Sequence, residues 1–341
     1  MRKTILFSSV IVLVTGACLL LGFTYSIPDE EKQQGLTGLF DVSKQGEIAY
    51  VQYEKGKPTL YVKSDRVSRV AQLPADQSIL DLTIMPDRKT ILYVTSDKEL
   101  NEDSNSTLHQ VNIESGEDEI LFTREAIVME IVIDPKDENQ LFYIQADRFS
   151  PYSPGASLYP YDFDVHSYQL KNGEHHQHTD LNKYSMASLQ VSSEDDSIYI
   201  QMDDDADSET EDQFFETKGR VFKIPIANPD RQLVISIPED TQDLYDFVLI
   251  PDRSELIYQA VAGTNSEGTY EYELFSYNWD SQSIHQLTEL HAYAGYPIYG
   301  ADGKVYFMVD QQFGERRPDH ALYKMNPDGS DVEVISLEES R

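Results

Sequence analysis

One short pattern recurs along this chain and restricts the folds that it can adopt. An apolar run, a turn with Pro and Asp, and a second apolar run ending in tyrosine fill Ile84 to Tyr93 and, with the same spacing, Leu249 to Tyr258. Looser copies of the pattern lie at 42–50, 133–143, 191–199 and 299–307. Two apolar runs around a Pro, Asp or Gly turn are typical of a tight antiparallel hairpin. The sequence therefore predicts one hairpin, repeated six times.

A second hairpin follows each copy of the first. Its strands are apolar or aromatic, and its turn is usually rich in Gly, Asn, Asp or Ser. These second hairpins are predicted at 60–73, 108–122, 168–178, 222–234, 275–287 and 323–335. The tyrosines that mark the repeat follow one another at about 43 to 59 residues, which suits one four-stranded blade each. We expect an all-β, six-bladed β-propeller; a seven-bladed ring or two packed sandwiches are the alternatives.

The repeated hairpin also carries a family likeness. Its apolar run, the Pro86-Asp87 or Pro251-Asp252 turn and the aromatic residue that follows resemble the repeat of TolB-like, WD-repeat-like propellers. The resemblance covers nearly the whole chain after residue 37. Only the second and fifth copies have the full Pro-Asp pair, so the other copies depart from the family pattern. The resemblance implies a propeller that serves as a protein-interaction module.

The first 28 residues are predicted to tether the protein to a membrane. Arg2 and Lys3 precede a stretch, 4–28, that has no charged residue, and about 20 apolar residues cross a bilayer as a helix. The two basic residues place the rest of the chain outside the cytoplasm. Cys18 and the small residues before it also resemble a lipobox, in which Cys18 would be lipidated. A signal anchor, a lipoprotein signal and a cleaved signal peptide are the alternatives.

After this segment we expect a linker at 29–37 and a single propeller domain at 38–341. Cys18 is the only cysteine of the chain, so the propeller contains no disulfide bond. The chain has 60 acidic and 27 basic residues, with a formal net charge of −33. Such a charge repels polyanions, and we expect no nucleic acid partner. It favours solubility, and it also attracts cations or basic partners.

Long polar insertions recur at one position of the repeat. In five of the six repeats they separate the second predicted strand from the third, at 96–106, 147–166, 203–220, 262–273 and 310–321. Propeller blades are related by rotation about one axis, so equivalent loops leave on the same face. Because loops carry function while the blades carry stability, this face is the candidate binding surface.

Two sets of residues on this face are candidates for partner binding. The first is the set of aromatic residues in the 147–166 insertion: Phe149, Tyr152, Tyr159, Tyr161 and Phe163. Prolines stiffen this segment, and rigid aromatic side chains suit peptide anchoring or stacking on a sugar. The alternative is that they pack onto their own blade. The second set is the adjacent pair Arg316 and Arg317, which either binds a carboxylate or offsets the acidic charge nearby.

Metal ligands are predicted at two places. In the fourth repeat the carboxylates alternate, and those suited to calcium are Asp203, Asp205, Asp207 and Glu209. The segment lacks the glycine and the glutamate spacing of an EF-hand loop, so a solvated acidic loop is the alternative. His176 and His178 would lie on the same side of a strand. Two imidazoles could hold a metal, but without a third ligand in the sequence the alternative is an ordinary exposed strand.

Motifs of the common enzyme classes are missing from the sequence. It has no Gly-x-Ser-x-Gly, no His-Glu-x-x-His and no phosphate-binding glycine loop. Fold alone does not determine chemistry, so the sequence leaves enzymatic activity undecided and favours a protein without it. We therefore expect a non-catalytic, membrane-anchored protein-interaction module without a cofactor, whose partner is an envelope or surface protein. The alternative is a carbohydrate or cell-wall-polymer binding protein or lyase.

Overall fold

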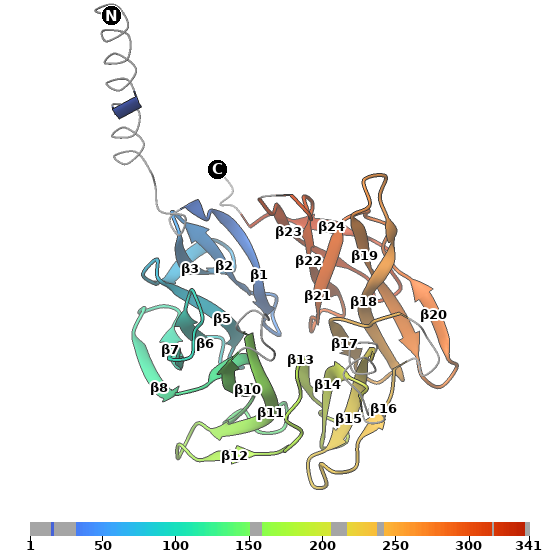
Figure 1. The fold of residues 1–341 in the computed structure, drawn as a ribbon, viewed down its shortest axis with the longest axis horizontal. Coiled ribbons are helices and arrows are strands. Elements are labelled where there is room, and N and C mark those ends of the chain that lie inside the picture. Colours follow the sequence, from blue (N-terminus) through green and yellow to red (C-terminus); the bar gives the residue numbers. More distant parts are fainter. Residues whose placement is uncertain are drawn as a thin grey trace, which may run out of the picture.

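The structure, a computed structural model of the chain, describes residues 15–16, 32–150, 159–205, 217–236, 242–315 and 317–337. From residue 35 onward, the regular secondary structure of these residues is all strand. The strands form antiparallel sheets arranged around a common centre (Figure 1). Among the described residues, we find no helix with the length and apolar character needed to cross a membrane.

Four consecutive strands come from each repeat, and we number these groups 1 to 6 along the chain. Groups 1 and 2 are β1 (Gly35–Val42), β2 (Ile48–Glu54), β3 (Lys57–Lys63), β4 (Val67–Gln72), β5 (Gln77–Ile84), β6 (Thr90–Asp97), β7 (Ser106–Asn112) and β8 (Asp118–Arg124). Groups 3 and 4 are β9 (Ile127–Ile133), β10 (Gln140–Ser150), β11 (Tyr159–Gln169), β12 (His175–Gln177), β13 (Met186–Val191), β14 (Ser197–Asp203), β15 (Gly219–Pro225) and β16 (Leu233–Val234). Groups 5 and 6 are β17 (Phe247–Ile250), β18 (Glu255–Thr264), β19 (Tyr270–Asn278), β20 (Ser283–Gln286), β21 (Tyr293–Tyr299), β22 (Val305–Asp310), β23 (His320–Met325) and β24 (Glu333–Ile335).

Strands pair in chain order within every group. Groups 1 to 4 are separate four-stranded sheets, whereas groups 5 and 6 are joined into one eight-stranded sheet. The junction is a single parallel pair, Tyr272 of β19 with Tyr293 of β21. The first strands lie toward the centre of the molecule, and strands such as β8, β12 and β20 lie at the rim (Figure 1). The paired hairpins predicted from the sequence are therefore confirmed.

The tyrosines that mark the repeat are core residues. Each lies in the second strand of its group and is at most 7% exposed: Tyr50, Tyr93, Tyr143, Tyr199, Tyr258 and Tyr306. The hydroxyl of Tyr199 donates a hydrogen bond of 2.9 Å to Asp195, in the turn just before its strand. Tyr306 bonds Asp302 in the same way, also at 2.9 Å. A buried phenol needs such an acceptor, which explains the acidic residue of the turn at these two copies.

The hydrophobic core lies between the groups. Each of its clusters takes side chains from two successive groups, as where Ile144 of group 3 packs with Ile200 and Met202 of group 4. One cluster joins the last group to the first through Tyr306, Met308 and Leu322 with Phe40 and Tyr50. Each group therefore buries both of its sheet faces against neighbours, including across the junction of the two chain ends.

Hydrogen bonds also cross from one group to the next near the centre. Four carboxylates accept backbone N–H groups from the first strand of the following group, and we call this set the carboxylate ladder. Its bonds are Ile84 to Asp41 at 2.7 Å, Ile131 to Asp81 at 2.8 Å, Ser188 and Leu189 to Glu130 at 2.9 and 2.7 Å, and Tyr296 to Asp246 at 3.3 Å. Between groups 4 and 5 a hydroxyl takes the same role, because Ser188 accepts the N–H of Phe247 at 3.2 Å.

Burial controls the protonation of the ladder. It raises the pKa of Asp41 and of Asp246, and it raises that of Asp81 well above the ordinary value. It also raises the pKa of Glu130, to about 7, against the lowering effect of the two N–H groups that this carboxylate accepts. The negative charges of Glu130 and Asp41 raise the pKa of Asp81 further. These four carboxyl groups therefore release their protons at a higher pH than exposed carboxyl groups do.

Two of the predicted insertions are hairpin extensions rather than loops. Strands β10 and β11 stay paired as far as Ser150 and Tyr159, so most of 147–166 is strand. Strands β18 and β19 stay paired to Thr264 and Tyr270, which leaves only 265–269 as the turn. The expectation of long loops at these two places was wrong. Polar and aromatic residues alternate along both segments, and alternation is the pattern of a half-buried strand.

Candidate functional site

Turns leave the sheets at two opposite ends. Because neighbouring strands are antiparallel, the turns between second and third strands emerge at one end, which we call the long-loop face. Turns between first and second strands emerge at the other end, the short-turn face. Of the predicted insertions, 98–105, 265–269 and the described part of 311–319 lie on the long-loop face.

Six aromatic side chains from groups 5 and 6 form a continuous cluster toward the long-loop face. We call it the aromatic band, and it consists of Tyr245, Tyr270, Tyr272, Tyr293, Tyr296 and Phe313. Tyr272 is at its middle, with ring centroids 5.0 Å from Tyr293 and 5.4 Å from Tyr245. Phe313 stacks on Tyr293 at 4.7 Å. Ring pairs at these distances attract one another beyond the area that they bury, so the band supports itself.

Backbone geometry positions the two central rings. Tyr270 and Tyr272 are two residues apart on β19, so they point to the same side of the sheet. Tyr272 pairs with Tyr293 across the junction of the two groups, which brings both rings to one place. Phe313 reaches them from the β22–β23 turn. The band therefore exists only because groups 5 and 6 share a strand pair.

The inner end of the band is strained. Tyr296 has a φ of 55°, a left-handed conformation that bulky residues rarely adopt. Its N–H bonds Asp246, and its ring covers Gly38 of β1, where a Cβ would lie 3.0 Å from ring atom Cε2. Strained residues persist only where their surroundings fix them, and they occur often at functional sites. The band thus runs from the exposed Tyr270 to the carboxylate ladder.

Several rings of the band face solvent. Tyr270 is 57% exposed, Tyr296 42%, Phe313 38% and Tyr245 37%. Partial burial raises the pKa of Tyr245 to about 12, and it also raises the pKa of Tyr293 and Tyr296. These phenols therefore stay protonated near neutral pH and can donate hydrogen bonds to a ligand. A contiguous exposed cluster of this kind is typical of a binding surface.

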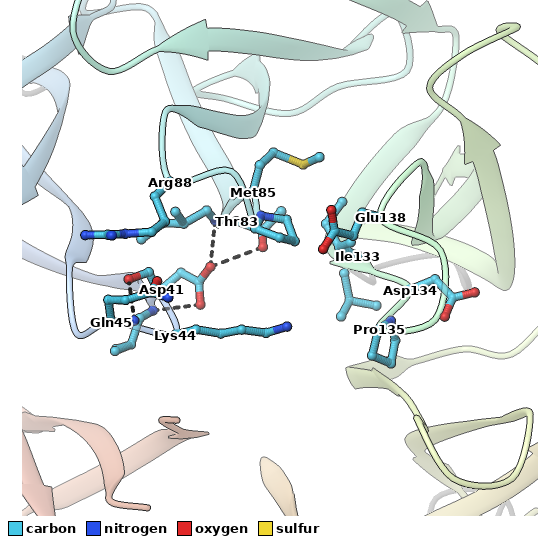
Figure 2. Close-up of a pocket in the computed structure, with 15 residues that line it drawn as sticks. Asp41, Lys44, Gln45, Thr83, Met85, Arg88, Ile133, Asp134, Pro135 and Glu138 are labelled. Atoms are coloured by element: carbon cyan, nitrogen blue, oxygen red, sulfur yellow. Dashed lines mark hydrogen bonds between the residues drawn. The ribbon is translucent and has the colours of Figure 1, made fainter. Parts of the chain in front are cut away.

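The short-turn face has a pocket of about 210 Å³ between groups 1, 2 and 3 (Figure 2). Its walls include Ile84, Met85 and Ile133, and the ladder residue Asp41 lies in it with its bonds to Thr83 and Ile84. The side chain of Lys44 extends along the pocket in Figure 2. Its lining therefore combines apolar surface with charges of both signs, but the first-to-second strand turns that form it are short.

Only some of the predicted aromatic residues can be placed. Phe163 is 2% exposed and packs in the cluster between groups 3 and 4, so it is a core residue and not a surface contact. Tyr161 is half-buried on β11. In the hairpin Phe149 is opposite Pro160 and Tyr159 is opposite Ser150, but the side chains of Phe149 and Tyr159 lie outside the description. Tyr152 lies outside the described residues altogether.

The predicted charged sites are described in part. Asp205 forms an ion pair with Lys183, whose ammonium also donates to the Asp203 carbonyl at 3.2 Å. Burial raises the pKa of Asp203. Asp207 and Glu209 lie outside the described residues, as do Cys18 and Arg316, whereas Arg317 is exposed. No three metal-ligating residues come together within the described ranges, and calcium binding by 203–209 stays a prediction.

The neighbouring histidines serve different contacts. His178 bonds Ser167 at 2.8 Å and its ring lies 4.8 Å from that of Phe142. His176 is exposed on β12 and touches His178 edge to face. Burial lowers the pKa of His178 to about 4. The two rings therefore do lie together, as the spacing predicts, but His178 is engaged by its own sheet.

Comparison with known proteins rests on structure. No family profile matches the chain, and no curated protein matches it by sequence. TolB from Acinetobacter baumannii superposes with a TM-score of 0.58 at 14% identity, over 87% of this chain and 65% of that one. A TolB candidate from Agrobacterium tumefaciens gives 0.55 at 16% identity, over 79% and 83%. An oligogalacturonate lyase in complex with manganese gives 0.56 at 13% identity, over 89% and 77%.

These similarities define the class of fold. Repeated four-stranded antiparallel sheets together with the TolB neighbours show that the chain is a β-propeller of the TolB-like kind. At identities of 13 to 16% the similarities show the fold alone, and the neighbours include a lyase as well as TolB proteins. The chain also spans less than two thirds of the A. baumannii TolB. Function must therefore be argued from the surface of this chain.

Sequence reasoning missed the aromatic band. The signal for it was present, because Tyr270 and Tyr272 alternate in a strand pattern and would share one side of a sheet. What the sequence does not contain is the pairing of Tyr272 with Tyr293, which lies between two repeats. A clustering that depends on contact between repeats cannot be read from the spacing within one repeat.

Proposed function

We propose that this chain is a six-bladed, non-catalytic propeller that binds another protein through the aromatic band on its long-loop face. The observation that carries the proposal is the exposure of four rings of the band in one contiguous cluster. Exposed tyrosine and phenylalanine side chains dominate binding energy at protein interfaces because they bury a large area at little cost in rotamer entropy. The accessible rings of the band therefore offer a large apolar area that a partner protein can bury.

The blade count rests on contacts between first strands. These strands touch one another in the cycle β1, β5, β9, β13, β17, β21 and back to β1. Each core cluster likewise lies between two successive groups. A closed cycle of this type supports six blades rather than two packed sandwiches. It also supports the view that the long-loop face is one continuous rim.

We further propose that the apolar segment at 4–28 holds the propeller at a membrane, outside the cytoplasm. The support is the sequence argument alone: two basic residues followed by an uncharged stretch. The partner would then be an envelope or surface protein. Membrane fractionation with protease accessibility of intact cells tests this; a propeller that protease cannot reach until the cytoplasm is opened would contradict it.

Site-specific photocrosslinking tests the binding surface. A photoreactive phenylalanine derivative at position 313 should yield a discrete crosslinked species in the organism that makes the protein, because Phe313 lies on the exposed side of the band. The matched control is the same derivative at Ile120, which is 64% exposed on the rim strand β8. Equal crosslinking from both positions, or none from 313, would contradict the proposed surface.

Binding of a neutral carbohydrate is the second candidate function. It is favoured by the same rings, since exposed tyrosines stack on sugar faces. An acidic polymer is disfavoured by the net charge of −33. Retention of the protein on purified wall polymers, reduced by Phe313→Ala, would support this function over the first.

A further inference from the structure

The acidity around the aromatic band points to the chemistry of its ligand. The segments that carry or flank the band are 242–246, 265–273, 289–296 and the described parts of 310–319. The described parts contain nine carboxylate residues against Arg317 and His291, and Arg316, which lies outside the described residues, adds a second arginine to 310–319. His291 is already engaged, at 3.0 Å from Glu271. The surroundings of the rings are therefore strongly negative.

Part of this acidity is structural. Glu273 is buried and bonds Thr288 and the N–H groups of Leu290 and His291, the latter two at 2.6 and 2.7 Å. Asp310 accepts the N–H groups of Gln312 and Asp319 at 3.0 and 2.8 Å, and so shapes the turn that carries Phe313. These carboxylates are occupied with holding the chain in place, and they are not offered to a ligand.

Four other carboxylates are exposed around the band. They are Glu267, Glu289, Glu315 and Asp319, and none of them forms a salt bridge with a described basic residue. Glu267 lies three residues before Tyr270, and Glu315 lies two residues after Phe313. We call these four the acidic rim. Arg316 and Arg317 offset part of this charge between Glu315 and Asp319, but the segments around the band keep an excess of carboxylates. A ligand that brings positive charge would therefore be attracted to this side of the molecule.

From this arrangement we infer that the aromatic band receives an extended, arginine-bearing segment of a protein partner, an inference that rests on the function proposed above. A guanidinium group stacks on the face of a tyrosine ring and at the same time bonds a carboxylate at its edge. The band offers tyrosine and phenylalanine faces, and Glu267 and Glu315 lie in the turns that carry or precede Tyr270 and Phe313. Lysine satisfies the charge but lacks the planar group that stacks.

An extended segment fits the shape of the band. Successive ring contacts from Tyr270 through Tyr272 and Tyr293 to Tyr296 have centroid distances of 6.5, 5.0 and 6.3 Å. Side chains on one side of an extended chain recur about every 6.6 Å, which is close to the first and third of these spacings. Alternate side chains of a bound segment would therefore meet rings at the outer and at the inner part of the band.

Fluorescence anisotropy with defined peptides tests the inference on the full-length protein. The probe is a fluorescein-labelled twelve-residue peptide of Gly-Arg-Pro repeats. The matched peptides replace arginine by lysine, citrulline or glutamate. We expect the arginine peptide to bind at least about tenfold more tightly than the citrulline peptide and several-fold more tightly than the lysine peptide, with no binding of the glutamate peptide. Equal binding of the arginine and citrulline peptides would overturn the inference.

Variants distinguish binding at the band from attraction by the overall negative charge of the protein. The double variant Tyr270→Ala, Phe313→Ala should lower the affinity for the arginine peptide at least about tenfold. The double variant Glu267→Gln, Glu315→Gln should lower that affinity about threefold at low salt. The control is Glu114→Gln with Glu117→Gln, two exposed residues of the β7–β8 turn, which should leave the affinity unchanged. Equal losses in the control and rim variants, or no loss in the ring variant, would mean diffuse attraction and overturn the inference.

The outcome is distinguishable from failure of the proposed function. If the derivative at 313 crosslinks a protein in cells but the arginine peptide does not bind, the binding surface stands and the cationic ligand is wrong. If a neutral oligosaccharide binds and is lost in the ring variant while the arginine peptide is not bound, both proposals are wrong and the carbohydrate function replaces them.

Discussion

The β10–β11 and β18–β19 hairpins differ in what they do with their aromatic residues. Both join the second and third strands of a group, and both extend toward the long-loop face. In the first, Phe163 is 2% exposed and packs against group 4. In the second, Tyr270 is 57% exposed and its ring lies 6.5 Å from that of Tyr272. Similar composition therefore leads to a core contact in one hairpin and to a surface in the other.

The difference is caused by what the next group presents. Group 4 contributes Met186 and Met202 to the same buried cluster as Phe163. Group 6 instead places Tyr293 and Phe313 beside β19, and these rings are themselves partly accessible. Whether an aromatic residue is available to a partner is thus decided by the neighbouring group, and not by the hairpin that contains it.

Truncation of the buried ring should have the largest effect on stability. Phe163→Ala removes a large side chain from a packed cluster, and such changes cost about 3 to 5 kcal/mol. Chemical denaturation of this variant should show a lower midpoint with an unchanged slope. If Phe163→Ala and Tyr270→Ala were equally destabilising, the distinction between the two hairpins would be lost.

The second largest effect on stability is expected at Gly295, which lies next to the Tyr293 ring of the band. A Cβ at Gly295 would lie 2.5 Å from the Gln259 amide nitrogen and 3.2 Å from the Tyr293 ring. That amide bonds the Ala294 carbonyl at 2.6 Å, so it cannot move without breaking a buried bond. Gly295→Ala should cost about 1 to 3 kcal/mol through overpacking. Gly263→Ala on β18, where the nearest atom is 4.0 Å away, is the control and should be nearly neutral.

The dependence of stability on pH tests the inner strand β9, which precedes the β10–β11 hairpin. Glu130 on β9 has a folded pKa of about 7 against an ordinary value of 4.5, so the folded protein holds a proton that the unfolded chain has released. Its contribution to stability is complete below pH 4.5 and is lost as the pH rises through 7. The loss should be on the order of 3 kcal/mol.

The comparison must be made with a variant, because other groups act in the opposite direction. Burial lowers the pKa of His166 and His178 to about 4, so these side chains stabilise the fold increasingly up to pH 6.5. The difference in melting temperature between the wild type and Glu130→Gln, measured from pH 5 to 8, removes the contribution of the histidines and reports Glu130 together with its effect on Asp81. The wild type should lose its advantage over the variant as the pH rises, and a constant difference would show that Glu130 does not titrate in this range.

The smallest effect on stability is expected at the exposed ring. Tyr270→Ala should change the free energy of unfolding by less than about 1 kcal/mol, because its side chain is mostly in solvent and loses only its contact with Tyr272. The same variant should reduce crosslinking from position 313. Loss of several kcal/mol on denaturation would instead make Tyr270 a structural residue, and the band would have to be explained as core.

Much of the fold was accessible from the sequence, and the site was not. The hairpin pattern at Ile84 to Tyr93 and its relatives predicted the paired strands, because strand periodicity and turn chemistry are local properties. The carboxylate ladder could not be predicted, since Asp41 and Ile84 are bonded across 43 residues and belong to different repeats. The aromatic band could not be predicted for the same reason. Sequence patterns describe one repeat, whereas both features are contacts between repeats.

The way in which the first and last groups meet has a further consequence. Among the described strands none is exchanged between them: β1 pairs within group 1 and β24 within group 6. The junction holds by packing and by bonds such as Tyr50 to the Leu337 carbonyl at 3.1 Å. Each group can therefore complete its own sheet as it leaves the ribosome, without waiting for a strand from the other end. Circularly permuted chains, opened between β8 and β9 and linked from residue 337 to residue 35, should assemble the same sheets.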